Sequence, residues 1–190
     1  MIIDCHVHAC TATPGHGRLS EQLLKQWNVR FMRWRLGIDA TDGAALERQA
    51  EDKLLGTVHG ADKLDAAVVL ALDAVYTRDG KLDEANTHLH VTNEYVAELA
   101  DRQPKVLFGA SIHPYRPDAV AELERWAQRG AVLVKWLPVV QNFNPADERC
   151  WPFYEALAHH RLPLLCHTGG ESMLPNLNNE VEDPLLLIPA

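Results

Sequence analysis

The sequence predicts an α/β fold with a parallel sheet, of the (β/α)8 TIM-barrel kind. Apolar runs alternate with amphipathic helical patterns along the chain, as in successive right-handed βαβ units. The run at residues 64–72 is almost continuously apolar, which is typical of a strand buried on both faces of a parallel sheet. Polar residues follow the apolar runs, at the strand ends where a barrel carries its active site: His6 and His8, Asp73, His113, Lys135 and His167.

Five strands are predicted, at residues 1–8, 64–72, 106–112, 131–136 and 162–166. Helices are expected between them, at residues 44–55, 92–100, 117–128 and 152–160, because apolar residues recur there at helical spacing. Five strands also suit a doubly wound open sheet. That fold needs a Gly-rich first turn to bind a nucleotide, and a His-x-His motif stands there instead. The barrel, with strands six to eight absent, is therefore the favoured prediction.

The whole chain, residues 1–190, is expected to belong to one barrel domain with an insertion or lid at about residues 11–60. Within it, apolar and aromatic side chains recur at helical spacing: Leu23, Trp27, Phe31 and Trp34. The favoured interpretation is a helix over residues 19–36 whose aromatic face packs on the protein body. The alternative is a lid beside the first strand, with an arginine, Arg35, available for an anionic substrate.

Composition limits the possible partners. The chain has 190 residues, 47% of them hydrophobic, and a formal charge of -8 from 18 basic and 26 acidic residues. Without a basic stripe, no nucleic-acid partner is expected. No apolar run reaches the roughly 20 residues of a membrane helix, so no membrane partner is expected either. The four cysteines have no zinc-finger or CxxC spacing, and two, Cys5 and Cys166, fall in strands predicted to be buried. We expect a reduced, cytoplasmic protein.

The first strand ends in Asp4-Cys5-His6-Val7-His8. Strand alternation should place Asp4, His6 and His8 on one face, where the two imidazoles can reach one metal ion. His167, from the fifth strand, would be a third nitrogen ligand, the number that a catalytic zinc site often has beside its water. The alternative is that these are ordinary histidines at strand ends. The pattern favours a site for one or two divalent ions, with zinc expected.

These motifs resemble the metal-dependent amidohydrolase superfamily, and most closely its amidohydrolase-2 branch, which also holds decarboxylases. The likeness rests on residues 4–8 (DCHVH), 112–114 (IHP), 134–138 (VKWLP) and 165–171 (LCHTGGE). It implies that His6, His8 and His167 are metal ligands. Lys135 falls where some members carry a carboxylated lysine that bridges two metals. A plain lysine that orients substrate or pairs with a carboxylate is the alternative.

The same family has eight strands, a further histidine after strand six and an aspartate after strand eight. That aspartate binds metal and handles the proton of the attacking water. The resemblance therefore implies that residues 1–190 are the N-terminal part of a longer protein. It also implies that the general base lies beyond residue 190. The apolar segment 185–190 would belong to the helix that leads to strand six. The open strand edges predict association, so a homo-oligomer is expected.

Two further residues are candidates for substrate binding. His113 either contacts substrate or is a hydrogen-bonded part of a turn. Glu171 either accepts a hydrogen bond near the metal or lies in the first turn of the next helix. The expected function is a metal-dependent hydrolase in which metal-bound water attacks an amide, lactone or ester of a small molecule. A non-oxidative decarboxylase is the first alternative, and an inactive fragment or binding module is the second.

Overall fold

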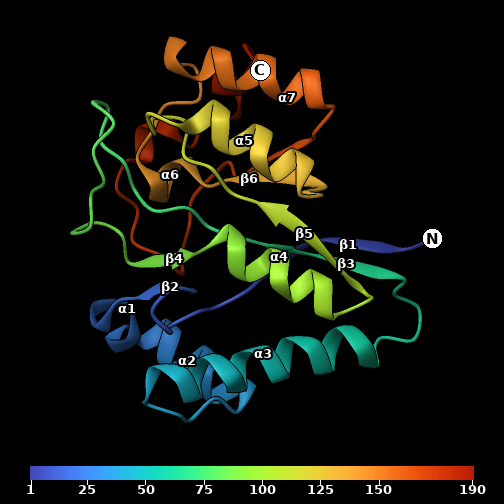
Figure 1. Cartoon of the computed structure of the whole chain (residues 1–190). Coiled ribbons are helices and arrows are strands. Elements are labelled where there is room, and N and C mark those ends of the chain that lie inside the picture. Colours follow the sequence, from blue (N-terminus) through green and yellow to red (C-terminus); the bar gives the residue numbers. More distant parts are fainter.

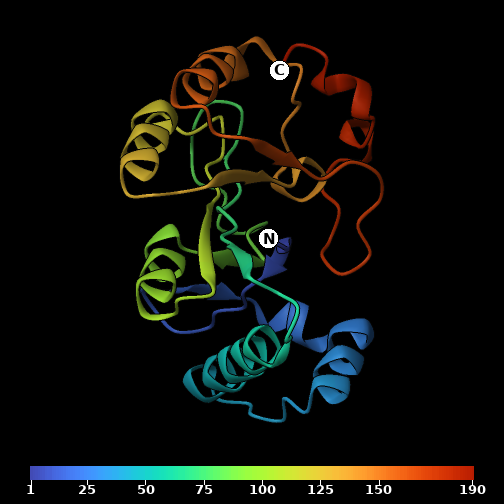
Figure 2. The ribbon, with the colours of Figure 1, turned by 90° about the vertical axis from the view of Figure 1, so that its right-hand side faces the viewer.

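The computed structural model describes all 190 residues and contains one five-stranded parallel sheet. Its strand order, β1-β3-β5-β6-β7, follows the chain, as it does in a barrel. Figure 2 shows these strands curling into part of a barrel wall. The predicted incomplete TIM barrel is confirmed. The five strands are β1 (Ile3–His8), β3 (Ala66–Leu70), β5 (Val106–Ala110), β6 (Leu133–Trp136) and β7 (Leu164–Cys166).

The two faces of the sheet are different. The face toward the helices belongs to the main core, which includes Val69, Phe108 and Trp136. The inner face of the curl carries a smaller cluster of Val68, Leu70 and Leu133, with Leu107 and Leu165 against it. Gly109 lies between these inner side chains. A β-carbon there would come within 2.6 Å of Leu70, so only glycine fits. The inner layer is therefore tightly packed below the strand ends.

Helices cover the outer face, and Figure 1 shows α5 and α7 on one side of the strands and α3 on the other. The helices that connect the strands are α3 (Gly43–Gly60), α4 (Asn93–Arg102), α5 (Ala119–Gln128) and α7 (Trp151–His160). Side-chain caps begin two of them, since Asp42 accepts from the backbone of Ala45 and Thr92 from that of Tyr95. All four predicted crossover helices are present. No helix combines the length and apolarity needed to cross a bilayer.

Short elements that the sequence patterns did not predict complete the chain. A four-residue helix, α6 (Pro138–Gln141), follows β6 directly. Three 3-10 turns follow later: η1 (Glu148–Cys150), η2 (Asn179–Val181) and η3 (Pro184–Leu187). The apolar segment at 185–190 was expected to be helical, but only the single turn η3 forms there. Pro184 begins that turn and Pro189 follows it.

β1 is exposed along most of its length, in contrast to the buried β3, β5 and β6. It pairs only with β3, so its other edge is open, and β7 likewise pairs only with β6. The expectation that Cys5 is buried is therefore wrong, because Cys5 lies on this exposed edge strand. Cys166, on β7, is partly buried. All four cysteines are free thiols.

The insertion is not one long helix over residues 19–36. It begins with the short strand β2 (Gly17–Leu19), which pairs with the later strand β4 (Leu89–Val91) to form a two-stranded ribbon. Two helices follow β2: α1 (Glu21–Lys25) and α2 (Trp27–Leu36). The two helices are separate because Gln26 is extended, with ψ 141°. The predicted packing of the aromatic face is wrong. Trp27 and Trp34 are 79% and 74% exposed, whereas Val29, on the opposite side of α2, is buried.

Candidate metal centre

His6 and His8 meet at the end of β1. Their Nε2 atoms are 2.9 Å apart, and the rings are arranged edge to face with centroids 4.8 Å apart. Both residues are exposed because β1 is an edge strand. Two ring nitrogens this close can bind the same ion. The structure thus brings together the two histidines that strand alternation predicted.

Asp4 does not share that face. The pairing of β1 with β3 shifts between Asp4 and Val7, as in a β-bulge. Asp4 pairs with Ala67, which lies on the same face of β3 as the helix-facing Val69. His8 pairs with Leu70, which faces the inside of the curl. The expectation that Asp4 shares a strand face with the histidines is therefore wrong, because a bulge breaks the alternation by two, but Asp4 still lines the same cavity as His8. Asp4 instead accepts a hydrogen bond from the backbone of His6 at 3.0 Å.

Lys135 and His167 continue the inner row of the barrel wall. Each lies two residues beyond an inward-facing leucine, Leu133 in β6 and Leu165 in β7. Lys135 is 1% exposed, and its ammonium makes no hydrogen bond or ion pair with another residue. The Nε2 atom of His167 is buried and has no hydrogen-bond partner. Buried polar atoms without partners are uncommon, and a ligand is one explanation.

Desolvation and neighbouring positive charge favour neutral imidazole at the end of β1. Desolvation of the ring, followed by the nearby His6 and Lys135, lowers the pKa of His8 to about 4, although part of the residue remains in contact with solvent. Burial is also the main cause that lowers the pKa of His6 and of Lys135. Neutral imidazole is the form that binds metal. The two histidines of β1 therefore suit a divalent ion in their chemistry.

The arrangement is not a finished metal site. No group of three His, Cys, Asp or Glu side chains lies in a geometry that could hold an ion. The His6–His8 pair is close together, and His167 is the group with a free buried nitrogen. A three-nitrogen site would require His167 to move toward the pair. The assignment of the three ligands stays a prediction.

A cavity of about 760 Å³ opens beside these residues. Its walls come from β1, the insertion, α4 and the ends of β6 and β7, and 23 of its 32 lining residues are hydrophobic. His8, Lys135 and His167 line it, whereas His6 reaches it only through His8. This is the size and polarity of a small-molecule site.

The remaining candidates differ in position. Glu171 lines the cavity, but one carboxylate oxygen accepts hydrogen bonds from the backbone of Met173 and Leu174, so it also orders its own loop. Arg35 is exposed on α2 and does not line the cavity. Arg33, two residues earlier, does line it. The sequence placed arginines next to the aromatic stripe of α2 but could not tell which of them, Arg33 or Arg35, faced inward.

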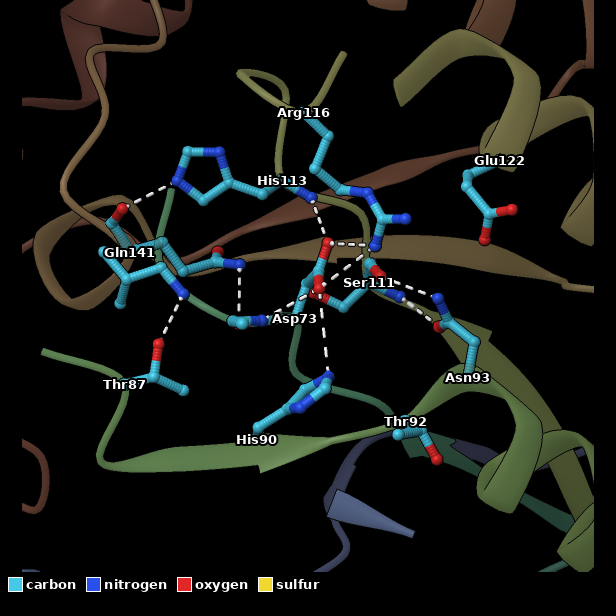
Figure 3. Close-up of polar contacts among 12 residues, drawn as sticks. Asp73, Thr87, His90, Thr92, Asn93, Ser111, His113, Arg116, Glu122 and Gln141 are labelled. Carbon is cyan, nitrogen blue, oxygen red and sulfur yellow. Dashed lines mark hydrogen bonds and ion pairs between the residues drawn. The ribbon is translucent and has the colours of Figure 1, made fainter. Parts of the chain in front are cut away.

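His113 belongs to a different, buried cluster (Figure 3). It is 0% exposed, its Nδ1 accepts from the backbone of Tyr115, and its Nε2 lies 2.7 Å from the carbonyl oxygen of Gln141. Burial lowers its pKa to about 4. It does not line the cavity. The position favours the alternative of a hydrogen-bonded turn over a substrate contact.

Asp73 is the centre of that cluster. Its carboxylate accepts from the backbone of His113 at 2.8 Å and from Arg116 at 3.2 Å, and His90 lies 3.9 Å away (Figure 3). Burial raises the pKa of Asp73, while Arg116 and the two backbone donors oppose the shift. Arg116 and Gln141 gave no signal in the sequence, because only the fold brings the loops after β5 and β6 together. We call these residues the Asp73 cluster: Asp73, His90, His113, Arg116 and Gln141.

Comparison with known proteins agrees with this fold. The amidohydrolase family profile matches residues 3–188, so the chain belongs to the amidohydrolase family. No curated protein matches the chain. Among solved structures, it is similar to 5-carboxyvanillate decarboxylase LigW2 from Novosphingobium aromaticivorans, a mutant with bound manganese and 3-methoxy-4-hydroxy-5-nitrobenzoic acid. That match has 17% identity and a TM-score of 0.52, and covers 98% of this chain and 54% of the other.

A second similar structure is the apo form of Metarhizium anisopliae IDCase. It has 13% identity and a TM-score of 0.47, and the match covers 88% of this chain and 50% of that one. The chain thus spans about half the length of the solved structures it matches. At these identities the likeness shows the fold alone. The superfamily predicted from the four sequence motifs is confirmed by the family match.

Proposed function

We propose that this amidohydrolase-family chain carries the metal-binding half of a non-oxidative decarboxylase. The observation that supports it best is the cavity. It places the buried, unpartnered nitrogen of His167 and the unpaired ammonium of Lys135 among mostly apolar walls. A carboxylate can enter beside a cation there, and the apolar surroundings destabilise its localised charge relative to the transition state, in which that charge moves onto the substrate carbon as neutral carbon dioxide leaves. The similar structure with bound manganese is that of a decarboxylase, which is consistent with the proposal.

His6, His8 and His167 would hold a divalent ion, zinc or manganese, which supplies positive charge to the substrate when bound. Lys135 and Arg33 would pair with anionic groups of the substrate, since neither makes an ion pair in the protein. In the reaction the bond between the substrate carbon and its carboxyl carbon breaks. The electron pair stays on the substrate carbon, and a proton from an acid group or water replaces carbon dioxide. The alternative of Lys135 as a carboxylated bridging ligand remains open.

A metal-dependent hydrolase is the second candidate, and the family match favours it. The same three histidines would hold the ion, and an amide, lactone or ester would occupy the cavity. Hydrolysis also needs a general base for the attacking water. Asp4 and Glu171 are the carboxylates of the cavity lining nearest the strand ends, and both accept backbone hydrogen bonds, Asp4 from His6 and Glu171 from Met173 and Leu174. We place decarboxylation first because of the cationic and apolar character of the cavity, not because of these carboxylates.

Product analysis separates the two reactions. The protein, expressed from its complete reading frame and loaded with manganese or zinc, is incubated with a panel of aromatic carboxylic acids and a panel of lactones and amides. We expect release of carbon dioxide and the decarboxylated product, and loss of that activity in His8→Ala. Hydrolysis products instead would establish the second candidate. Stoichiometric metal with no turnover of either panel would overturn both and leave a binding module.

A further inference from the structure

We propose that the part of the cavity enclosed by the insertion binds the apolar body of an amphipathic carboxylic acid, with an aliphatic chain or several fused rings. We call it the insertion chamber and define it by six of its lining residues: Leu23, Met32, Leu36, Leu46, Ala50 and Leu54. The proposal names the substrate class and rests on the proposed function. It makes α1, α2 and α3 a binding wall of the site.

The volume argues for a large ligand. A cavity of about 150 Å³ is enough to enclose benzene. The cavity beside His8 measures about 760 Å³, and most of the side chains that line it are hydrophobic. A carboxylic acid with one ring would leave most of this apolar wall in contact with water. A longer apolar body would remove that surface from water, which stabilises the complex in proportion to the area buried.

The polar groups of the cavity lie where the head of such a ligand would be. His8, Lys135 and His167 come from the strand ends, whereas the apolar wall comes from the insertion. Glu51 also lines the cavity, but it accepts from the hydroxyl of Tyr95 at 2.7 Å and lies 3.6 Å from Arg102. Its charge is therefore already paired. The other two carboxylates of the lining also have donors, since Asp4 accepts from the backbone of His6 and Glu171 from those of Met173 and Leu174.

Arg33 gives a second, independent indication of a ligand. Its Nη2 donates to the carbonyl of Ala40 at 2.6 Å, but its Nε is buried and has no hydrogen-bond partner. No carboxylate of the chain pairs with it, and it lines the cavity among apolar side chains. A buried N–H without a hydrogen-bond partner is costly, and Arg33 is half-buried with one such group. The wall thus combines apolar area with an unpaired positive charge, as an amphipathic acid requires.

The test measures direct binding, so it does not depend on turnover. Titration calorimetry of the metal-loaded protein with linear carboxylates from hexanoate to dodecanoate should give one site. Affinity should rise about fourfold for each added methylene. Ala50→Trp fills the chamber and should abolish the rise, while Ala121→Trp, at an exposed position on α5, should keep it. Met32→Glu places a charge in the wall at a 43% exposed position and should reduce the rise without unfolding the protein.

Two controls make the outcome decisive. The exposed aromatic side chains of α2 also attract apolar chains, so Trp34→Ser must leave the length dependence unchanged. Affinity that is independent of chain length in the wild type, or that is lost in Trp34→Ser, would overturn the proposal. An affinity that rises with chain length, without decarboxylation of any acid, would support the insertion chamber and reject the proposed function. Turnover of single-ring acids, without a rise in affinity with chain length, would support the proposed function and reject the insertion chamber.

Discussion

Two polar groups of residues lie near the strand ends, and they differ in how far their hydrogen bonds are satisfied. In the Asp73 cluster, both nitrogens of His113 and the carboxylate of Asp73 have partners within the protein. In the candidate metal centre, Lys135 and the Nε2 of His167 have none. Because an unpaired buried polar group is costly, the first arrangement stabilises the fold and the second is suited to a ligand. Both groups combine histidines with a basic residue, so the presence or absence of hydrogen-bond partners distinguishes them better than their residue types do.

The largest effect should come from breaking the satisfied cluster. Asp73→Ala leaves the backbone N–H of His113 without an acceptor and removes one of the two carboxylates that Arg116 contacts, the other being Asp118. The free energy of unfolding should fall by about 3–5 kcal/mol, as when one partner of a buried pair is removed. Urea denaturation measures it. Asp62→Ala, at an exposed position without partners, is the control and should stay within about 0.5 kcal/mol. Equal losses in the two variants would contradict the comparison.

Acid should weaken the same cluster through His113. Its pKa is about 4 in the folded protein and near 6.5 in the unfolded chain, so between these values only the unfolded chain binds the proton. Its contribution to stability is therefore complete above pH 6.5 and is lost as the pH falls toward 4, by about 3 kcal/mol in all. Denaturation midpoints across this range should depend less on pH in His113→Asn than in the wild type. The same dependence in both proteins would show that His113 is not the group responsible.

In the candidate metal centre the expected change is in metal binding rather than in folding. His6→Ala should weaken zinc or manganese binding about 100-fold, since even residues that only support a ligand cost 10- to 100-fold. The metal-free variant should unfold within about 0.5 kcal/mol of the wild type, because His6 is exposed. Elemental analysis and denaturation of the same samples check both. His59→Ala, an exposed histidine on α3, is the control. Equal metal content in His6→Ala and wild type would reject the ligand assignment.

The smallest effect is expected on α2, whose aromatic side chains lie in solvent. Trp34→Ser should change the free energy of unfolding by less than about 0.5 kcal/mol. Trp126→Ser, at a 4% exposed position on α5, should cost about 3–5 kcal/mol. Thermal denaturation of the two variants gives the comparison directly. A large loss for Trp34→Ser would mean that this stripe packs against another surface in solution, such as the second copy expected in a homo-oligomer.

Sequence patterns identified much of the fold because strand and helix periodicity is local. The strands β3, β5, β6 and β7 and the four crossover helices lie within a few residues of the predicted ranges. The insertion was misread because helical spacing alone cannot say which surface will meet a core. Leu23 is buried, but Trp27, Phe31 and Trp34 are not. The ribbon of β2 and β4 escaped local patterns too, because its strands are about 70 residues apart in the chain.

By itself, the sequence determined the parallel βα order, the family and the residues at each strand end, because these depend on short-range patterns that the chain carries in order. The tertiary structure decided which of those residues meet. In the folded chain the rings of His6 and His8 are in contact, and a bulge places Asp4 on the other face of β1. His113 is buried against Asp73, and Arg33 rather than Arg35 lines the cavity. These outcomes follow from strand register and helix rotation. A shift of one residue in either exchanges an inward for an outward side chain, and only packing against the rest of the molecule fixes it.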